Sequence, residues 1–195
     1  MLSQESGWVG RWSPGIGDAS IAGWVTVVAY FFAVFLCARA YLRRRSDDRY
    51  QAERRVWLAL ACALLGLGIN KQLDLQTALT EAGRTLALQQ GWYAERRVVQ
   101  GIFVLAVIIG GVGVGGWLLT QARRSSKALR KGLLGAVTLG AFVVVRAASF
   151  HHVDLLLGQT WAGLRLNVLL EIGGIVWVAC GAASVRPAHK QSATV

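Results

Sequence analysis

Polar side chains that could carry out chemistry gather at a few positions in an otherwise apolar sequence. His151, His152 and Asp154 supply imidazole and carboxylate groups close together, and Glu171 interrupts an apolar run farther along. Imidazole and carboxylate groups bind divalent metals and act as general acids and bases. We therefore take these four residues as candidate catalytic groups. His151, His152 and Asp154 are also candidate ligands of a divalent metal.

A second set of polar residues could hold a ligand around that centre. Asn70 and Asp74 are four positions apart, as are Asn167 and Glu171, so each pair shares one face of a helix. Lys71 could instead snorkel, and Asn70 with Asp74 could cap or staple helices. The candidate ligand-binding residues are Asn70, Lys71, Asp74, Arg146, Ser149 and Asn167.

The elements that must position these groups are membrane spans. Hydrophobic residues make up 54% of the chain, which is too apolar for an ordinary soluble surface. No charge interrupts residues 19–38 or 98–122, and either run can cross a hydrocarbon core of about 30 Å as a helix. We expect an all-α, polytopic transmembrane helix bundle in a single domain. Its five predicted spans are residues 19–40, 54–74, 98–121, 131–151 and 164–185.

Two charged residues fall inside predicted spans, Arg146 in the fourth and Glu171 in the fifth. A charge within a span costs at least a few kcal/mol and marks a pathway, a pair or a site. Counted from the outer ends of their spans, the two depths differ by only about 3 Å. The sequence therefore predicts that Arg146 and Glu171 are paired, directly or through Asn167 or a water, with Lys71 as the next candidate partner.

The distribution of basic residues predicts the orientation of the chain. Fourteen of the 21 Lys and Arg residues fall between Arg39 and Arg55, between Arg123 and Lys131, or in the tail. Basic residues accumulate in short cytoplasmic loops, so the N-terminus should be outside and the C-terminus in the cytoplasm. The net charge of +11 is thus a topology signal rather than evidence for nucleic-acid binding. The basic loops could also contact anionic lipid headgroups.

Two further patterns concern helix packing. In the connection between the second and third spans, Leu75, Leu79, Ala82 and Leu86 form the apolar stripe of an amphipathic helix. We expect this helix to lie on the outer surface or to cover the bundle, or to be a mere connector. In the third span, residues 110–116 contain five glycines. Gly111 and Gly115 form a GxxxG pair that favours close helix packing, whereas the accidental GxGxxG match lacks the strand that a dinucleotide site needs.

Four strings of the sequence resemble a family of small bacterial inner-membrane proteins: INKQLDLQT (69–77), GWYAERRVVQ (91–100), VRAASFHHVD (145–154) and GLRLNVLLEIGG (163–174). Members of that family are sometimes labelled isopropylmalate isomerase. That enzyme class is soluble and holds an iron–sulfur cluster on cysteines, whereas Cys37, Cys62 and Cys180 lie widely spaced in predicted spans. The resemblance implies a multi-pass inner-membrane protein and marks residues to test, without naming a reaction.

Three function classes remain open from the sequence. The first is a non-catalytic membrane subunit or assembly factor, which would bind another membrane protein or a second copy of the chain within the lipid bilayer. The second is a membrane-embedded enzyme, such as a metal-dependent hydrolase or transferase, that acts on a lipid-linked substrate from the outer face. A transporter or haem protein is the third, although the sequence shows no inverted repeat and its two adjacent histidines suit no two-histidine haem.

Overall fold

The computed structural model describes residues 7–8, 12–16, 18–44, 50–148, 160–161 and 164–186. Within these ranges the regular secondary structure is helical apart from one short antiparallel pair, β1 (Thr160–Trp161) with β2 (Leu164–Arg165). The predicted all-helical class is confirmed. Four stretches are long and apolar enough to cross a membrane: Ile21–Arg43, Gln51–Leu73, Val98–Arg123 and Lys127–Arg146. The fifth predicted span corresponds to a shorter apolar helical stretch, Val168–Ala183.

Single residues fix the ends of the first helices. α1 (Ile21–Arg43) is capped by Ser20, whose hydroxyl accepts a hydrogen bond from the Gly23 amide at 3.0 Å. α2 (Gln51–Leu73) is separated from α3 (Leu75–Gln89) only by Asp74, which has a φ of 48° in the left-handed region. Asp is one of the few residues that tolerate this conformation, so Asp74 turns the chain without a loop.

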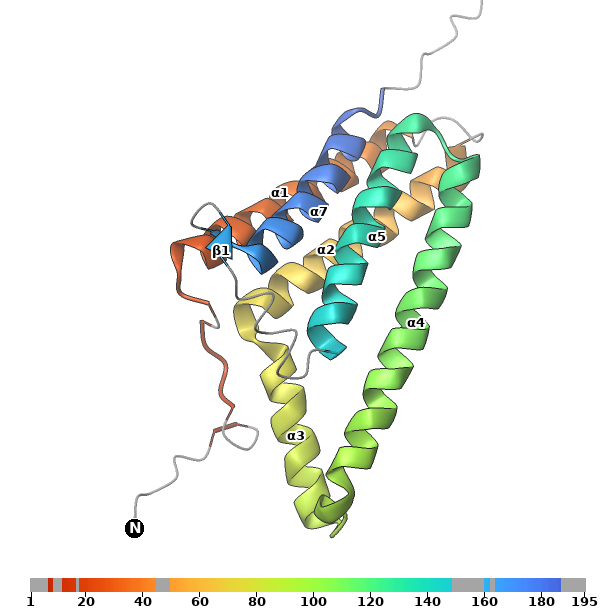
Figure 1. The fold of residues 1–195 in the computed structure, drawn as a ribbon. Coiled ribbons are helices and arrows are strands. Elements are labelled where there is room, and N and C mark those ends of the chain that lie inside the picture. Colours follow the sequence, from red (N-terminus) through yellow and green to blue (C-terminus); the bar gives the residue numbers. More distant parts are fainter. Residues whose placement is uncertain are drawn as a thin grey trace, which may run out of the picture.

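The remaining helices complete a bundle with one long arm. The 3-10 turn η2 (Tyr93–Glu95) leads into α4 (Arg96–Arg124), which is followed by α5 (Lys127–Ala148) and α7 (Leu166–Ala183). The predicted amphipathic helix is present as α3. It packs against α2 and η2, and Figure 1 shows it leading away from α1 and α7 to meet the start of α4, so it does not cover the bundle.

The apolar helices are neighbours in the order α2, α1, α7, α5, α4, with the core between them. α2 and α5 also touch at one point, where the fully buried ring of Trp57 packs on Gly132. A methyl group on Gly132 would lie 2.7 Å from Trp57 Cη2. The largest fully buried side chains include Tyr30, Trp57, Leu129, Leu133, Ile175 and Val178.

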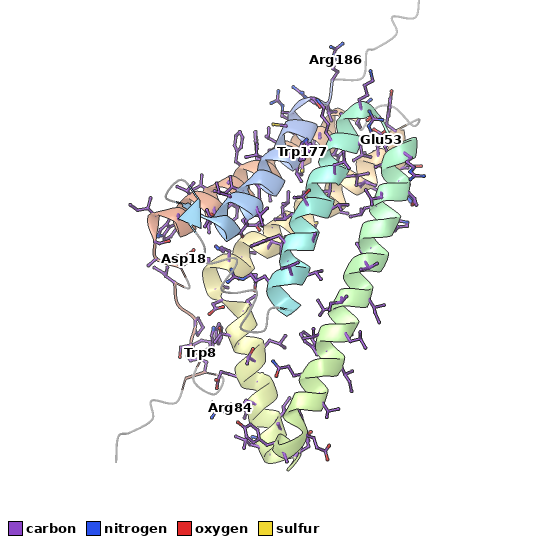
Figure 2. All side chains as sticks on the ribbon, viewed as in Figure 1. Trp8, Asp18, Glu53, Arg84, Trp177 and Arg186 are labelled. Atoms are coloured by element: carbon purple, nitrogen blue, oxygen red, sulfur yellow. The ribbon has the colours of Figure 1, made fainter. Side chains whose placement is uncertain are left out.

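The two ends of the bundle are named here after residues labelled in Figure 2. At the Glu53 end, α1, α4 and α7 finish while α2 and α5 begin, and at the Asp18 end this is reversed. Two contacts close the Glu53 end. Arg43 Nη1 donates to the Val185 carbonyl at 2.8 Å, and the Glu53 carboxylate accepts from the Ser126 amide and hydroxyl at 2.6 and 2.9 Å.

Glycines set the register between α5 and α7. A methyl group on Gly135 would lie 2.6 Å from the Val178 nitrogen, and one on Gly181 would lie 2.5 Å from the Gly132 nitrogen. Gly174 is similarly close to Leu139. Small residues allow such close backbone approach in membranes. The close packing therefore lies between α5 and α7, where the sequence did not predict it.

Only one glycine of the predicted GxxxG pair on α4 packs against another helix. Gly111 packs against the Val144 side chain of α5, but a Cβ at Gly115 would meet nothing within 4 Å. The Gly111–Val144 contact also fixes the relative length of the two helices. α5 ends four residues beyond Val144, whereas α4 begins 15 residues before Gly111. α4 thus projects past the end of α5 by about 16 Å, taking 1.5 Å per residue.

Candidate functional site: a buried ion pair between α2 and α7

Glu171 is the most deeply buried acidic residue in the described part of the chain, with 5% of its surface exposed. Both of its carboxylate oxygens have partners from other helices. Tyr30 on α1 donates its hydroxyl hydrogen to Oε1 at 3.0 Å, and Lys71 on α2 places Nζ 3.2 Å from Oε2. The group therefore joins α1, α2 and α7 through one side chain.

The backbone around the pair explains how these side chains meet. α7 runs parallel to α1, as the contacts of Glu171 with Tyr30 and of Val185 with Arg43 show. Tyr30 is 2% exposed and passes beside Gly68 of α2, where an added methyl group would lie 3.0 Å from Tyr30 Cβ. Gly68 thus leaves the space through which the Tyr30 hydroxyl reaches α7.

The N-terminal segment adds a second carboxylate to the cluster. Asp18 Oδ2 lies 3.9 Å from Lys71 Nζ, while Asp18 Oδ1 accepts hydrogen bonds from the Ser20 amide and hydroxyl. Trp12 donates its indole hydrogen to the Leu73 carbonyl at 3.2 Å, which satisfies one of the free carbonyls at the end of α2. Lys71 accordingly lies between two acids with only 15% of its side chain exposed.

The predicted direct pair between Arg146 and Glu171 is wrong, and pairing through Asn167 or a water is not tested, because the Asn167 side chain is outside the description. Within the described residues Glu171 pairs with Lys71, the second candidate, and Arg146 is exposed in the last turn of α5. The glycine register explains the error, because the contacts between α5 and α7 place Arg146 level with Asn167 and Glu171 level with Phe142. Arg146 therefore lies about 6 Å farther toward the Asp18 end than Glu171, taking 1.5 Å per residue.

The other predicted site residues have different positions. Asn70 is half-buried on α2, directly before Lys71. Asp74, predicted to share a ligand-binding face with Asn70, is the exposed turn residue between α2 and α3, and its carboxylate accepts a hydrogen bond from the Thr77 hydroxyl at 2.6 Å. The Asn167 backbone lies in the first turn of α7, but its side chain is outside the description.

The predicted metal ligands are not tested by the structure. Ser149, His151, His152 and Asp154 lie outside the described residues. Among the residues that are described, no group of three or more His, Cys, Asp or Glu side chains could hold a metal ion.

Tyr30 and Asp18 are parts of the cluster that the sequence analysis missed. Tyr30 is the only tyrosine within the five predicted spans, and a hydroxyl placed in hydrocarbon requires a partner. That signal could have pointed to α1 as the third element of the site. Asp18 gave a weaker signal, because an acid directly before a span also suits a helix cap.

The geometry favours a structural role for the ion pair. Glu171 has a cation and a hydroxyl donor, so its negative charge is compensated within the bundle. Removing one partner of such a buried pair typically costs 3–5 kcal/mol, because the other charge is then buried alone. The cluster therefore holds three helices in one arrangement and orients Lys71 toward the Asp18 end.

Comparison with protein-family models, with curated proteins and with solved structures finds no match to this chain. A function must therefore be argued from its own residues.

Proposed function

We propose that this chain is a five-span protein of the bacterial inner membrane, with its N-terminus outside and its C-terminus in the cytoplasm, that serves as a non-catalytic subunit or assembly factor. The orientation is supported by the excess of basic residues in the segments that flank the Glu53 end. The same end carries the starts of α2 and α5 and the ends of α1, α4 and α7, as five crossings of alternating direction require.

α7 is shorter than the other four apolar helices, so its crossing of the membrane needs separate support. Its 18 residues correspond to about 27 Å, slightly less than the usual hydrocarbon core. It packs between α1 and α5, which are both long enough to span. A helix that packs between two membrane spans lies at the same depth in the bilayer as they do, so we count α7 as the fifth crossing.

The observation that carries the proposed function is the open glycine face of α4. A Cβ at Gly110, Gly113 or Gly116 would meet nothing within 4 Å. Gly113 lies about 160° around the helix from Gly111, the glycine that contacts α5. Each interior glycine costs a helix about 1 kcal/mol relative to alanine, and small residues on a membrane helix permit close approach of another helix. The occupant that we propose for this face is an apolar transmembrane helix of a partner protein.

The buried ion pair supports the same assignment. A catalytic carboxylate must reach a substrate, whereas both Glu171 oxygens are occupied by Tyr30 and Lys71. The polar cluster thus contributes to the stability of the bundle, and α4, the least buried of the four long apolar helices, is the surface that we assign to recognition. Its exposed large side chains include Ile102, Phe103, Ile109 and Val112.

Site-specific photo-crosslinking in native membranes tests the proposal. A photoreactive residue at Ile109 or Val112 should give one discrete adduct with another membrane protein. The same residue at Phe35, an equally exposed position on α1, should not. Gly113→Leu should abolish the adduct, whereas Gly140→Leu, which fills an open position on α5, should leave it intact.

The other outcomes separate the alternatives. An adduct of about twice the 21.0 kDa chain mass would replace the partner by a second copy. If α4 gives no adduct while the purified protein retains a stoichiometric divalent metal that is lost on replacement of both His151 and His152, the subunit proposal is wrong. The membrane-embedded enzyme is then the better assignment.

A further inference from the structure

Two arginine–tyrosine stacks join α1 and α2 at the Glu53 end, and they are reciprocal. Arg44, which follows α1, lies over the ring of Tyr50, with its guanidinium carbon 3.7 Å from the ring centre. Arg54 of α2 lies over the ring of Tyr41 of α1 at 5.1 Å. Stacking holds a guanidinium in one orientation and leaves its charge in place.

In both Arg44 and Arg54, one N–H group of the guanidinium has no hydrogen-bond acceptor. The Nε atoms of Arg44 and Arg54 are buried without a hydrogen-bond partner. So is Nε1 of Trp57, a fully buried residue one turn beyond Arg54. Buried donors are almost always paired in native proteins. Unpaired donors at one end of two adjacent helices therefore indicate a missing acceptor.

The described residues offer no carboxylate to compensate these charges. Glu53 is the only acid among them at this end, and its two oxygens accept from Ser126. Asp47 and Asp48 lie outside the described residues. The surrounding surface is also cationic, with exposed residues that include Arg39, Arg55, Lys127, Arg130, Lys131 and Arg186.

Fixed guanidinium groups in a cationic setting are suited to a particular ligand chemistry. A planar guanidinium fork matches the oxygens of a phosphate group, and such charge-assisted hydrogen bonds are stronger than neutral ones. In the proposed orientation, the Glu53 end meets the cytoplasmic leaflet, which carries the anionic lipids.

We infer that Arg44 and Arg54 form a binding site for a phosphate group, and that an anionic phospholipid headgroup supplies it. The stacks with Tyr50 and Tyr41 hold the two guanidinium groups ready for the phosphate oxygens. This site is independent of the α4 face that carries the proposed function. It lies on α1 and α2, so the partner assignment of α4 can fail without affecting the phosphate site, whereas the choice of a lipid of the cytoplasmic leaflet rests on the proposed orientation.

Lipid binding to the purified full-length chain tests the site. Dioctanoyl phosphatidylglycerol is titrated into the protein in a neutral detergent, and bound lipid is counted by native mass spectrometry. Arg44→Gln and Arg54→Gln should each weaken binding by about tenfold, because each removes a charge-assisted contact. Arg55→Gln removes the same charge from the adjacent exposed position and should weaken binding by only about twofold.

The tyrosines provide a second series that leaves every charge in place. Tyr41→Leu and Tyr50→Leu remove the stacking ring and should weaken binding by about threefold to fivefold. Tyr41→Phe and Tyr50→Phe keep the ring and should stay within about twofold of the parent chain. This series decides the question even if an arginine variant fails to fold.

Two matched ligands identify the source of the phosphate. Dioctanoyl phosphatidylcholine, which has no net charge, should bind at least about tenfold more weakly than phosphatidylglycerol. Competition by inorganic phosphate at concentrations equal to the lipid would support the anion site but assign it to a soluble phosphate. Equal losses for Arg44→Gln, Arg54→Gln and Arg55→Gln would overturn the site, since only a diffuse positive potential would then attract the lipid. Equal losses for the Phe and Leu variants would equally overturn the role of the stacks.

Discussion

The Asp18 end and the Glu53 end of the bundle differ in how their charged side chains are compensated. At the Asp18 end, Glu171 is buried between helices with its partners Lys71 and Tyr30 beside it. At the Glu53 end, Arg44 and Arg54 lie in a cationic surface, stacked on tyrosine rings, with no ion pair among the described residues.

Among the described residues, the carboxylate enclosed by three helices is paired within the protein, whereas the half-buried arginines at the other end are not paired with an acid. A buried charged group needs a partner from the protein itself, since neither water nor a headgroup can reach it. Near the interface, excess positive charge is tolerated and also orients the chain. Removal of a cation should therefore have a large effect at one end and a small effect at the other.

Breaking the ion pair should cause the largest loss of stability. Lys71→Met leaves the Glu171 carboxylate buried without a cation and should cost about 3–5 kcal/mol of unfolding free energy. The double variant with Glu171→Leu should lose at least about 1 kcal/mol less than the sum of the two single losses. Unfolding monitored in detergent provides the measurement. A strictly additive double variant would show that the two residues do not interact, and Arg146→Leu is the matched control that should combine additively with Lys71→Met.

Filling the α5–α7 contact should have the next largest effect. Gly135→Ala brings a methyl group against the Val178 backbone nitrogen, which cannot move aside, and should cost about 2–3 kcal/mol. Gly140→Ala adds the same methyl group on the same helix in open space and should be neutral or slightly stabilising. Equal thermal shifts for the two variants would contradict the register on which the depth of Glu171 depends.

Removal of one hydroxyl tests the third member of the buried cluster. Tyr30→Phe takes a hydrogen bond from Glu171 Oε1 and should cost about 1–2 kcal/mol. Tyr41→Phe, in the same helix but stacked under Arg54, should change stability by less than about 0.5 kcal/mol. We expect the same ranking in urea and thermal unfolding. If Tyr30→Phe leaves the unfolding free energy unchanged, the stabilising cluster is only the pair of Lys71 and Glu171.

The smallest effect should come from cations at the Glu53 end. Arg44→Gln and Arg55→Gln, measured in neutral detergent without anionic lipid, should each change the unfolding free energy by no more than about 0.5–1 kcal/mol. The difference between these losses of unfolding free energy and the loss for Lys71→Met tests the contrast between the two ends. If Arg44→Gln is as damaging as Lys71→Met, the stacked arginine has a buried partner and the contrast between the ends is lost.

The sequence predicted the helices well because span length and charge position are local properties. α1 begins two residues after the predicted start, and α2 ends one residue before the predicted end. The stripe of Leu75, Leu79, Ala82 and Leu86 correctly predicted α3. The direction of α3 could not be predicted from the sequence, since the left-handed turn at Asp74 depends on how the neighbouring helices pack.

The site was only partly predictable because pairing depends on register. Lys71 and Glu171 were both chosen as polar residues near a membrane interface, and the structure brings them together. Arg146 was preferred as the partner because depths were counted from predicted span ends. Glycine contacts between α5 and α7, which depend on three-dimensional packing, increase the difference in depth from about 3 Å to about 6 Å.

The unequal lengths of α4 and α7 have a consequence for the surrounding lipid. The apolar stretch of α4, Val98–Arg123, has 26 residues, or about 39 Å, and that of α7, Val168–Ala183, corresponds to about 24 Å. A flat bilayer of uniform thickness cannot match both, so hydrophobic mismatch arises along one side of the protein only. Mismatch is relieved by helix tilt or by local thickening of the bilayer, and each carries an elastic penalty. In the proposed five-span arrangement, the elastic penalty is therefore greatest beside α4, and that side gains most when another membrane protein replaces the strained lipid.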